Sequence, residues 1–247
     1  SNSVKSISTS GNYLYLATAG GGVKISTQNG ASFMTRTKTH GLGDNEVNSV
    51  FSSGNYVYAA TDAGVSVSNN NGTSWVNYTT EDGLGSNQIW DVYYNNGYLY
   101  AATAAGISVS SDNGASWLSY NSFNTNGGLP AGEPVAVYAF DNYLLAGYYG
   151  GTWSNNQWIT GGIAISENNG TSWITYTADN GLGVPSGMYD NAVNDIFIVD
   201  GLLFVANNRA IAISAFSSVP EPSTYGLALG GLALAVVAVR RRNKVSK

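Results

Sequence analysis

The stretch Ser68–Trp75 reads SNNNGTSW, and three further stretches of the chain repeat its pattern. All four begin with Ser, carry Asn-Gly in the middle and end in an aromatic residue. The other copies are Ser26–Phe33 (STQNGASF), Ser110–Trp117 (SSDNGASW) and Ser166–Trp173 (SENNGTSW). Successive motif glycines are 42, 42 and 56 residues apart, so the third interval contains an insertion of 14 residues. Such a period indicates a repeat architecture.

Each repeat also contains a β-strand pattern. In the second repeat, short runs of β-branched and aromatic residues occupy 47–52, 56–61, 64–68 and 74–79, separated by Gly, Asn and Asp turns. Corresponding runs begin at Val4, Ile89, Val135 and Val193, which makes five units, the last without its fourth strand around 214–218. A period of about 42 residues with four antiparallel strands is typical of a propeller blade.

We therefore predict an all-β fold: a β-propeller of about five four-stranded antiparallel blades over residues 1–216, followed by a separate segment, 217–247. The 31 Gly and 17 Tyr, with only 10% charged residues, are typical of turn-rich β proteins. Two arrangements stay open. Either the units close a small ring, in which a missing N-terminal strand completes the fifth blade, or they are part of a larger propeller.

The repeated octapeptide resembles the Asp-box, or BNR repeat, which in its family forms the turn between the third and fourth strands of a blade. In such a turn Gly supplies a positive φ, Ser and the third residue bond to turn amides, and the aromatic anchors the returning strand. Asp112 keeps the family's Asp, whereas Gln28, Asn70 and Asn168 replace it. The resemblance implies structural roles for Ser26, Gly30, Phe33, Ser68, Gly72, Trp75, Ser110, Asp112, Gly114, Trp117, Ser166, Gly170 and Trp173.

A second pattern lies in the segments that join the repeats. These segments are His40–Val47 (HGLGDNEV), Asp82–Ile89 (DGLGSNQI) and Asn180–Val184 (NGLGV). With a following strand such as Leu99–Thr103 (LYAAT), they are similar to the propeller repeat of two-component regulator sensors. This resemblance also implies a propeller.

Composition excludes several kinds of partner. The chain has no Cys, so it has neither disulfides nor thiolate metal sites. Residues 1–219 hold 14 Asp and Glu against 5 Lys and Arg, and this acidic body argues against binding nucleic acid. Because Ser1 follows no initiator Met and no apolar signal stretch, we expect that an N-terminal segment has been removed or was never included.

The last residues, 219–247, read VPEPSTYGLALGGLALAVVAVRRRNKVSK. Pro220, Glu221 and Pro222 precede an uncharged apolar run, 225–239, and Arg240, Arg241 and Arg242 follow it. This order resembles the PEP-CTERM sorting signal, which in its family is cleaved near Pro-Glu-Pro by exosortase, an integral membrane protease. The resemblance implies an exosortase partner and an exported protein.

Physical arguments support a membrane role for residues 225–239. Fifteen helical residues span roughly 22 Å, less than the ~30 Å hydrocarbon core, so the helix would anchor only marginally. The arginines should stay in the cytoplasm, which places the body on the exported side. An ordinary C-terminal anchor is the alternative.

The sequence offers little for catalysis. A sialidase resembling the known Asp-box enzymes needs three arginines around its substrate, and the body has only Arg36 and Arg209. His40 is the only histidine, which excludes a multi-histidine zinc site and favours a solvated turn residue. Carboxylate pairs such as Glu81 with Asp82, or Asp190 with Asp195, could serve a glycosidase. Calcium at an Asp- and Asn-rich turn is conceivable, but no segment has the EF-hand spacing. We therefore predict no metal and no cofactor.

The insertion in the fourth unit, Tyr148–Gly161 (YYGGTWSNNQWITG), is the most suggestive place for binding. It contains Tyr149, Trp153 and Trp158, and it should lie on the blade face that carries the linkers between blades. Exposed aromatic rings with polar neighbours suit sugar rings. The alternative is a β-hairpin extension that covers a blade edge or packs on the neighbouring blade.

These observations predict an exported, exosortase-processed surface or extracellular-matrix protein. Its propeller would be a non-catalytic binding or scaffold module, with polysaccharide or a surface protein as partner. The alternative is an extracellular glycan-active enzyme with a carboxylate pair on the propeller face. Before processing, the C-terminal segment would hold the chain transiently in the inner membrane.

Overall fold

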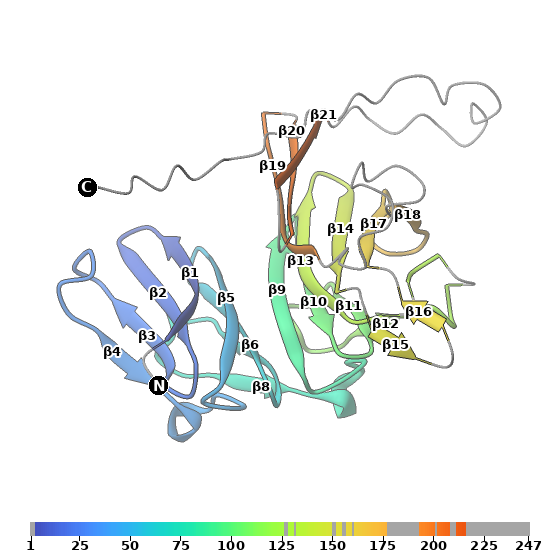
Figure 1. The fold of residues 1–247 in the computed structure, drawn as a ribbon. Coiled ribbons are helices and arrows are strands. Elements are labelled where there is room, and N and C mark those ends of the chain that lie inside the picture. The colour runs from blue at the N-terminus through green and yellow to red at the C-terminus, as the bar shows by residue number, and fades with distance from the viewer. Residues whose placement is uncertain are drawn as a thin grey trace, which may run out of the picture.

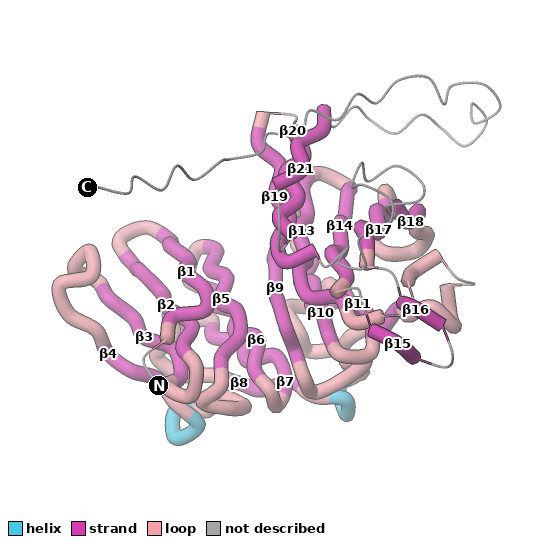
Figure 2. Tube along the Cα trace, in the orientation of Figure 1, coloured by secondary structure: helices cyan, strands magenta, loops and turns pink. Residues whose placement is uncertain are grey.

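The computed structural model describes residues 3–125, 128–130, 132–149, 152–154, 157–159, 161–176, 193–200, 202–207 and 211–215. They form five blades (Figures 1 and 2): four four-stranded sheets and a last, three-stranded one, with an additional two-stranded hairpin. The prediction of an all-β propeller fold is confirmed. The expected C-terminal helix, residues 225–239, lies outside the described residues, and no helix in the described part is long and apolar enough to cross a membrane.

The strands follow the repeats closely. The first blade contains β1 (Val4–Ser10), β2 (Tyr13–Thr18), β3 (Gly22–Ser26) and β4 (Met34–Arg36). The second contains β5 (Val47–Ser53), β6 (Tyr56–Thr61), β7 (Gly64–Ser68) and β8 (Val76–Tyr78). The third contains β9 (Ile89–Asn95), β10 (Tyr98–Thr103), β11 (Gly106–Ser110) and β12 (Leu118–Tyr120). The fourth contains β13 (Pro134–Phe140), β14 (Tyr143–Tyr148), β17 (Gly162–Ser166) and β18 (Ile174–Tyr176), and the fifth contains β19 (Val193–Val199), β20 (Leu202–Asn207) and β21 (Ile211–Ala215).

Every blade has two distinct ends, because consecutive strands are antiparallel. The turns between first and second strands lie at one end together with the octapeptide turns, as the bond from Asn71 N–H to Asn55 O (3.0 Å) shows. We call this the box end. The turns between second and third strands lie at the other end, beside the segments that join the blades, and Ala104 N–H donates there to Gln88 O (3.0 Å). We call this the linker end.

The octapeptide turns are held by the side chains that the sequence singles out. Ser68 Oγ accepts from the N–H groups of Asn70 (3.3 Å) and Gly72 (2.9 Å). Asn70 Oδ1 accepts from Ser74 N–H (3.0 Å), as Asp112 Oδ1 does from Ser116 N–H (2.9 Å). Because this position needs only an acceptor oxygen, an amide replaces the carboxylate without losing the bond. The departures from Asp are therefore compatible with the same turn.

In the octapeptide turns of the second, third and fourth blades, the glycine and the aromatic residue contact the neighbouring blade. Gly72 has φ +81, and a Cβ there would lie 2.4 Å from Ile25 Cδ1 of the first blade. Trp75, Trp117 and Trp173 are buried against the preceding blade. Phe33, predicted to have the same structural role, is exposed because no blade precedes it in the described part of the chain.

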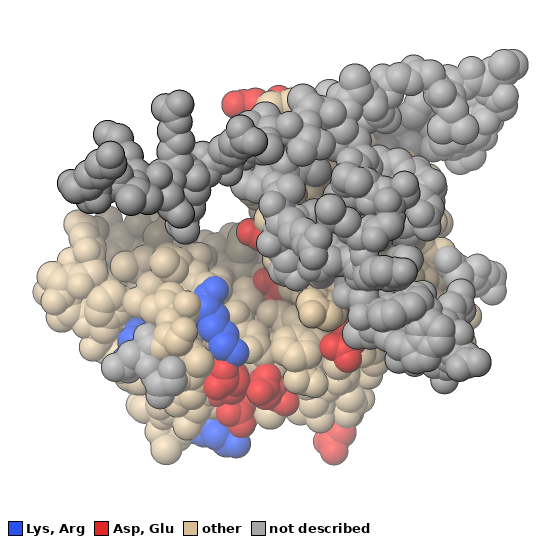
Figure 3. Space-filling model, viewed as in Figure 1, with Lys and Arg blue, Asp and Glu red and all other residues tan. Residues whose placement is uncertain are grey.

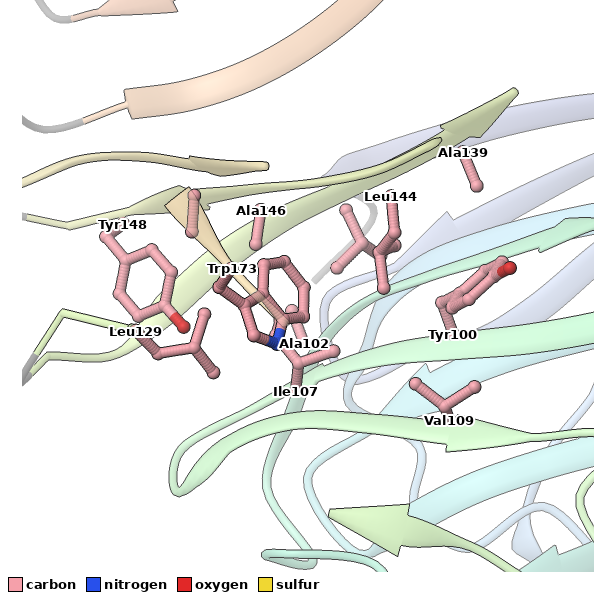
Figure 4. Close-up of a cluster of buried hydrophobic side chains, with 12 residues drawn as sticks. Tyr100, Ala102, Ile107, Val109, Leu129, Ala139, Leu144, Ala146, Tyr148 and Trp173 are labelled. Atoms are coloured by element: carbon pink, nitrogen blue, oxygen red, sulfur yellow. The ribbon is translucent and has the colours of Figure 1, made fainter. Parts of the chain in front are cut away.

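The hydrophobic core lies between the blades rather than inside one. Figure 4 shows the cluster between the third and fourth blades, where Tyr100, Leu144 and Trp173 pack together. Leu129, from the segment that joins these blades, packs beside Tyr148 in the same cluster. Each blade thus depends on its neighbour for burial, as expected of stacked repeats.

The described blades form an open arc rather than a closed ring of five. The inner strands β1, β5, β9, β13 and β19 pack side by side in this order. Val50, Val92 and Val137 are each at most 3% exposed, because each faces the preceding blade. Ile7, at the same position of β1, is 64% exposed, and Phe197 on the outward face of β19 is exposed as well. Of the two arrangements left open by the sequence, the described residues do not show the small closed ring.

Candidate binding face

The insertion in the fourth blade forms a hairpin at the linker end. β15 (Thr152–Ser154) pairs with β16 (Gln157–Ile159), and the hairpin follows Tyr149 at the end of β14. Tyr149 N–H donates to Glu133 O (3.0 Å), the same contact that fixes the linker end of the third blade. The side chain of Tyr149 is 45% exposed. The predicted placement on the linker face is thus observed.

Trp153 and Trp158 are direct partners in the register of this hairpin. Residues opposite each other in an antiparallel pair belong to one face of it. The side chains of both tryptophans lie outside the described part of the structure, so their role in binding stays a prediction.

The segments that join the blades share a capped turn. His40 Nδ1 accepts from Thr37 N–H (3.2 Å), and Asp82 Oδ2 accepts from Thr79 N–H (2.8 Å). The third segment repeats this contact, because Asn124 Oδ1 accepts from Asn121 N–H (2.8 Å). His40 and Asp82 are therefore parts of turn caps, in the short 3-10 helices η1 (Lys38–His40) and η2 (Thr80–Asp82).

Phe123 lies on the third capped turn, between Asn121 and Asn124, and is 92% exposed. The corresponding residues of the other two turns are Thr39 and Glu81, both exposed and polar. The turn is well tied, since Thr125 Oγ1 also donates to Asn121 O (2.6 Å). An ordered turn thus presents an aromatic ring to solvent beside the linker that leads to the fourth blade. Sequence reasoning missed it, although an alignment of the three segments would have identified it.

A polar cluster lies at the linker end of the first two blades. Lys5 forms an ion pair with Glu46 and donates from Nζ to Asn48 Oδ1 (2.7 Å). Asn48 Nδ2 donates in turn to Asp62 Oδ1 (2.8 Å) and to Ile89 O (2.8 Å). We use "polar cluster" for Lys5, Glu46, Asn48 and Asp62. Figure 3 shows basic and acidic side chains bordering each other in one patch of the face in view.

A second ion pair extends the charged patch. Lys38 Nζ lies 3.3 Å from Asp44 Oδ2, and Asp44 Oδ1 accepts from Glu46 N–H (2.9 Å). The backbone bond from Glu46, followed by the contact with Lys38, lowers the pKa of Asp44. Lys5 and Lys38 are thus both paired with carboxylates. The patch therefore presents hydrogen-bond acceptors to a ligand rather than an unpaired positive charge.

One carboxyl group lies between the inner strands. Burial raises the pKa of Asp91, on β9, to about 6, although the Ser49 hydroxyl and the N–H groups of Val137 and Val92 bond to the carboxylate and lower it. Burial also raises the pKa of Asp195, which lies on β19. A perturbed carboxyl group can mark a functional site, but the hydrogen bonds of Asp91 are those of a contact that joins blades.

Of the carboxylate pairs that could serve a glycosidase, only Glu81 with Asp82 lies wholly within the described residues. Asp82 is engaged in a turn cap, and Glu81 beside it is exposed. Asp190 lies outside the described residues. Within the described ranges, no group of three or more His, Asp or Glu is placed to hold a metal ion.

Comparison with known proteins places this geometry in a family. The DUF6242 beta propeller domain matches residues 1–144. The chain belongs to this family. The match covers the first three blades, the segment that joins the third blade to the fourth, and β13, and it ends within β14. No curated protein matches the chain of this DUF6242 propeller. The Asp-box resemblance is not shown by these matches and stays a resemblance.

The PEP-CTERM protein-sorting motif matches residues 218–242 of the DUF6242 propeller chain. The motif includes Pro220, Glu221 and Pro222 and reaches the arginines 240–242. It indicates an exported protein that is anchored in the membrane before processing by exosortase and then lies on the cell surface. These residues lie outside the described part of the structure.

Solved structures show the same fold. The extracellular domain of a hybrid two-component system from B. thetaiotaomicron has a TM-score of 0.65 and 22% identity, over 86% of this chain and 28% of that chain. An ancestral GH74 enzyme has a TM-score of 0.61 and 19% identity, over 86% of this chain and 29% of the enzyme. YCF48 from Cyanidioschyzon merolae has a TM-score of 0.60 and 13% identity, over 95% of this chain and 70% of YCF48. The chain spans less than a third of the first two structures, and identities this low establish the fold alone.

Proposed function

We propose that this DUF6242 propeller is a non-catalytic binding module of the cell surface, which holds polysaccharide at its linker end. The hairpin β15–β16 carries the proposal, because the insertion that contains it is found in the fourth blade alone among the first four and brings Trp153 and Trp158 close after the exposed Tyr149. Aromatic residues bind sugars by stacking on their apolar ring faces, while polar groups nearby bind the hydroxyls.

Two further features of the linker end support this function. Phe123 presents its ring to solvent from an ordered turn. The polar cluster supplies carboxylate and amide groups that can bond to sugar hydroxyls. Sorting to the cell surface brings the protein to a place where a surface polysaccharide can reach it. A surface protein is the second class of partner compatible with this face.

The test compares polysaccharide retention of three variants in affinity electrophoresis. Trp153→Ala and Trp158→Ala should each lose most of the retention that the parent chain shows. Leu118→Ala is the matched control, because Leu118 is a strongly exposed apolar residue on the outer strand β12. Retention that survives both tryptophan changes, or falls equally in the control, would contradict the proposal.

A second candidate function is a glycan-active enzyme. The carboxyl groups of Asp91 and Asp195 both lie on inner strands, and burial raises the pKa of each, which is the direction that a general acid needs. An enzyme would hydrolyse the polysaccharide that it retains, and Asp195→Asn would abolish release of reducing ends without loss of binding. Retention without any hydrolysis favours the binding module.

A further inference from the structure

The last described strand shows where the chain leaves the propeller. β21 pairs with β20 so that Ala215 lies opposite Leu202, which follows the turn between β19 and β20. In the first blade Ser26, where the octapeptide begins, lies opposite Leu14, the second residue of β2, just as Ser214 lies opposite Leu203. Ala215 is therefore at the box end, and the tail departs from that end of the fifth blade.

The sorting motif follows at once. Four residues, 216–219, separate Ala215 from Pro220, and ten steps along the chain lead to Tyr225, where the apolar run begins. Ten residues reach at most ~35 Å when fully extended, and a flexible segment of that length has a root-mean-square span of about 17 Å. The box end of the fifth blade is thus tied closely to the anchoring segment.

We use "tether" for residues 216–225, which connect the fifth blade to the apolar run. The linker end lies farther from the start of this tether than the box end does. β20 alone, six residues long, spans roughly 20 Å from the box end toward the linker end, at ~3.3 Å per residue. The turns, joining segments and hairpin lie beyond it. If the linker end lay on the lipid, the tether would have to run back along the blade and stretch beyond its root-mean-square span of about 17 Å.

We propose that the membrane-anchored precursor stands with its box end toward the lipid surface and presents its linker end, with Tyr149, Phe123 and the polar cluster, away from the membrane. The orientation comes from the tether and not from adsorption. The box end carries the exposed carboxylates Asp112, Asp141, Glu167 and Asp200, which an anionic lipid surface would repel. This orientation would serve any ligand of the linker end, and it goes beyond the proposed function.

Single cysteines test the orientation, because the chain has none of its own. Asn142→Cys labels the box-end turn between β13 and β14, and Ala105→Cys labels the linker-end turn between β10 and β11; both positions are exposed. The full chain is reconstituted into phosphatidylcholine vesicles that contain a headgroup quencher, and the fluorescence of a label at each cysteine is measured. The label at position 142 should be quenched several-fold more than the label at 105, at low and at high salt.

Equal quenching at the two positions, or stronger quenching at 105, would overturn the proposal. A second pair of variants tests the tether as the cause, with twelve Gly and Ser residues inserted between Ser218 and Val219. The longer tether should reduce the difference between the two labels. An undiminished difference would mean that lipid contacts hold the body, and would also overturn the proposal. Neither result depends on polysaccharide binding, so the proposed function is tested separately.

Discussion

The Asp91 carboxylate of β9 accepts a hydrogen bond from the N–H of Val137 on β13 (2.9 Å), and so joins the third blade to the fourth. Its other oxygen accepts from Val92 N–H (2.9 Å), and Ser49 of β5 also bonds to it. Three consecutive inner strands therefore meet at a single carboxyl group. Since burial favours the neutral form of this group, the contact is sensitive to pH.

The first prediction concerns stability against pH. The pKa of Asp91 is about 6 in the folded chain and about 3.9 in an unfolded one, so the folded state binds a proton more tightly. The free energy of unfolding should therefore rise as pH falls from about 6 to about 4, by up to ~2–3 kcal/mol from this group. Urea denaturation at several pH values measures it. Asp91→Asn keeps an acceptor oxygen and should remove most of this rise, and an unchanged pH profile in that variant would be contrary evidence.

A second prediction concerns packing between blades. Gly72→Ala should destabilise the chain by about 2–3 kcal/mol, because Ala disfavours the positive φ and its methyl group would strike Ile25 Cδ1. Gly54→Ala is the control, since Gly54 also has a positive φ but has no atom within 4 Å of its added Cβ. It should cost about 1 kcal/mol. Equal losses in the two variants would show that Gly72 serves only its turn.

The octapeptide turns give a third prediction. Asp112→Asn should change stability by less than about 0.5 kcal/mol, because Asn70 and Asn168 already accept the equivalent bonds. Asp112→Ala removes the acceptor and should cost about 1 kcal/mol. Thermal unfolding of both variants checks this. A large loss in the Asn variant would mean that the charge of Asp112, and not only its oxygen, holds the turn.

Phe123 provides a fourth prediction, which separates binding from folding. Phe123→Ala should leave stability unchanged, since the ring is almost wholly in solvent, and should weaken retention of polysaccharide. Leu129→Ala, in the same joining segment, removes a buried side chain and should cost about 2–5 kcal/mol. If Phe123→Ala retained polysaccharide as well as the parent chain does, Phe123 would not be part of the binding face.

The blades could be predicted because their signals are local. The turn glycines, the serine caps and the alternating strand residues each act within one repeat, and the structure places the strands of the second unit almost where the sequence does. The fourth strand, β8, is shorter than expected, because Ser74 and Trp75 still belong to the turn.

The polar cluster could not be predicted in the same way. Lys5, Asn48 and Asp62 come from two blades and more than 50 residues of chain, and only the packing of β1 beside β5 brings them together. The exposure of Phe33 had no local signal either, because it depends on a blade that would have to precede the first one. Contacts between blades, rather than within them, are what the repeat pattern leaves undetermined.

Export and processing at the sorting motif are tested most directly by the mass of the mature protein recovered from the cell surface. An exported propeller processed at its sorting motif should end close to Pro220–Pro222 and should lack Arg240, Arg241 and Arg242. A chain that keeps these arginines and is recovered from the cytosol would show that the protein is neither exported nor processed.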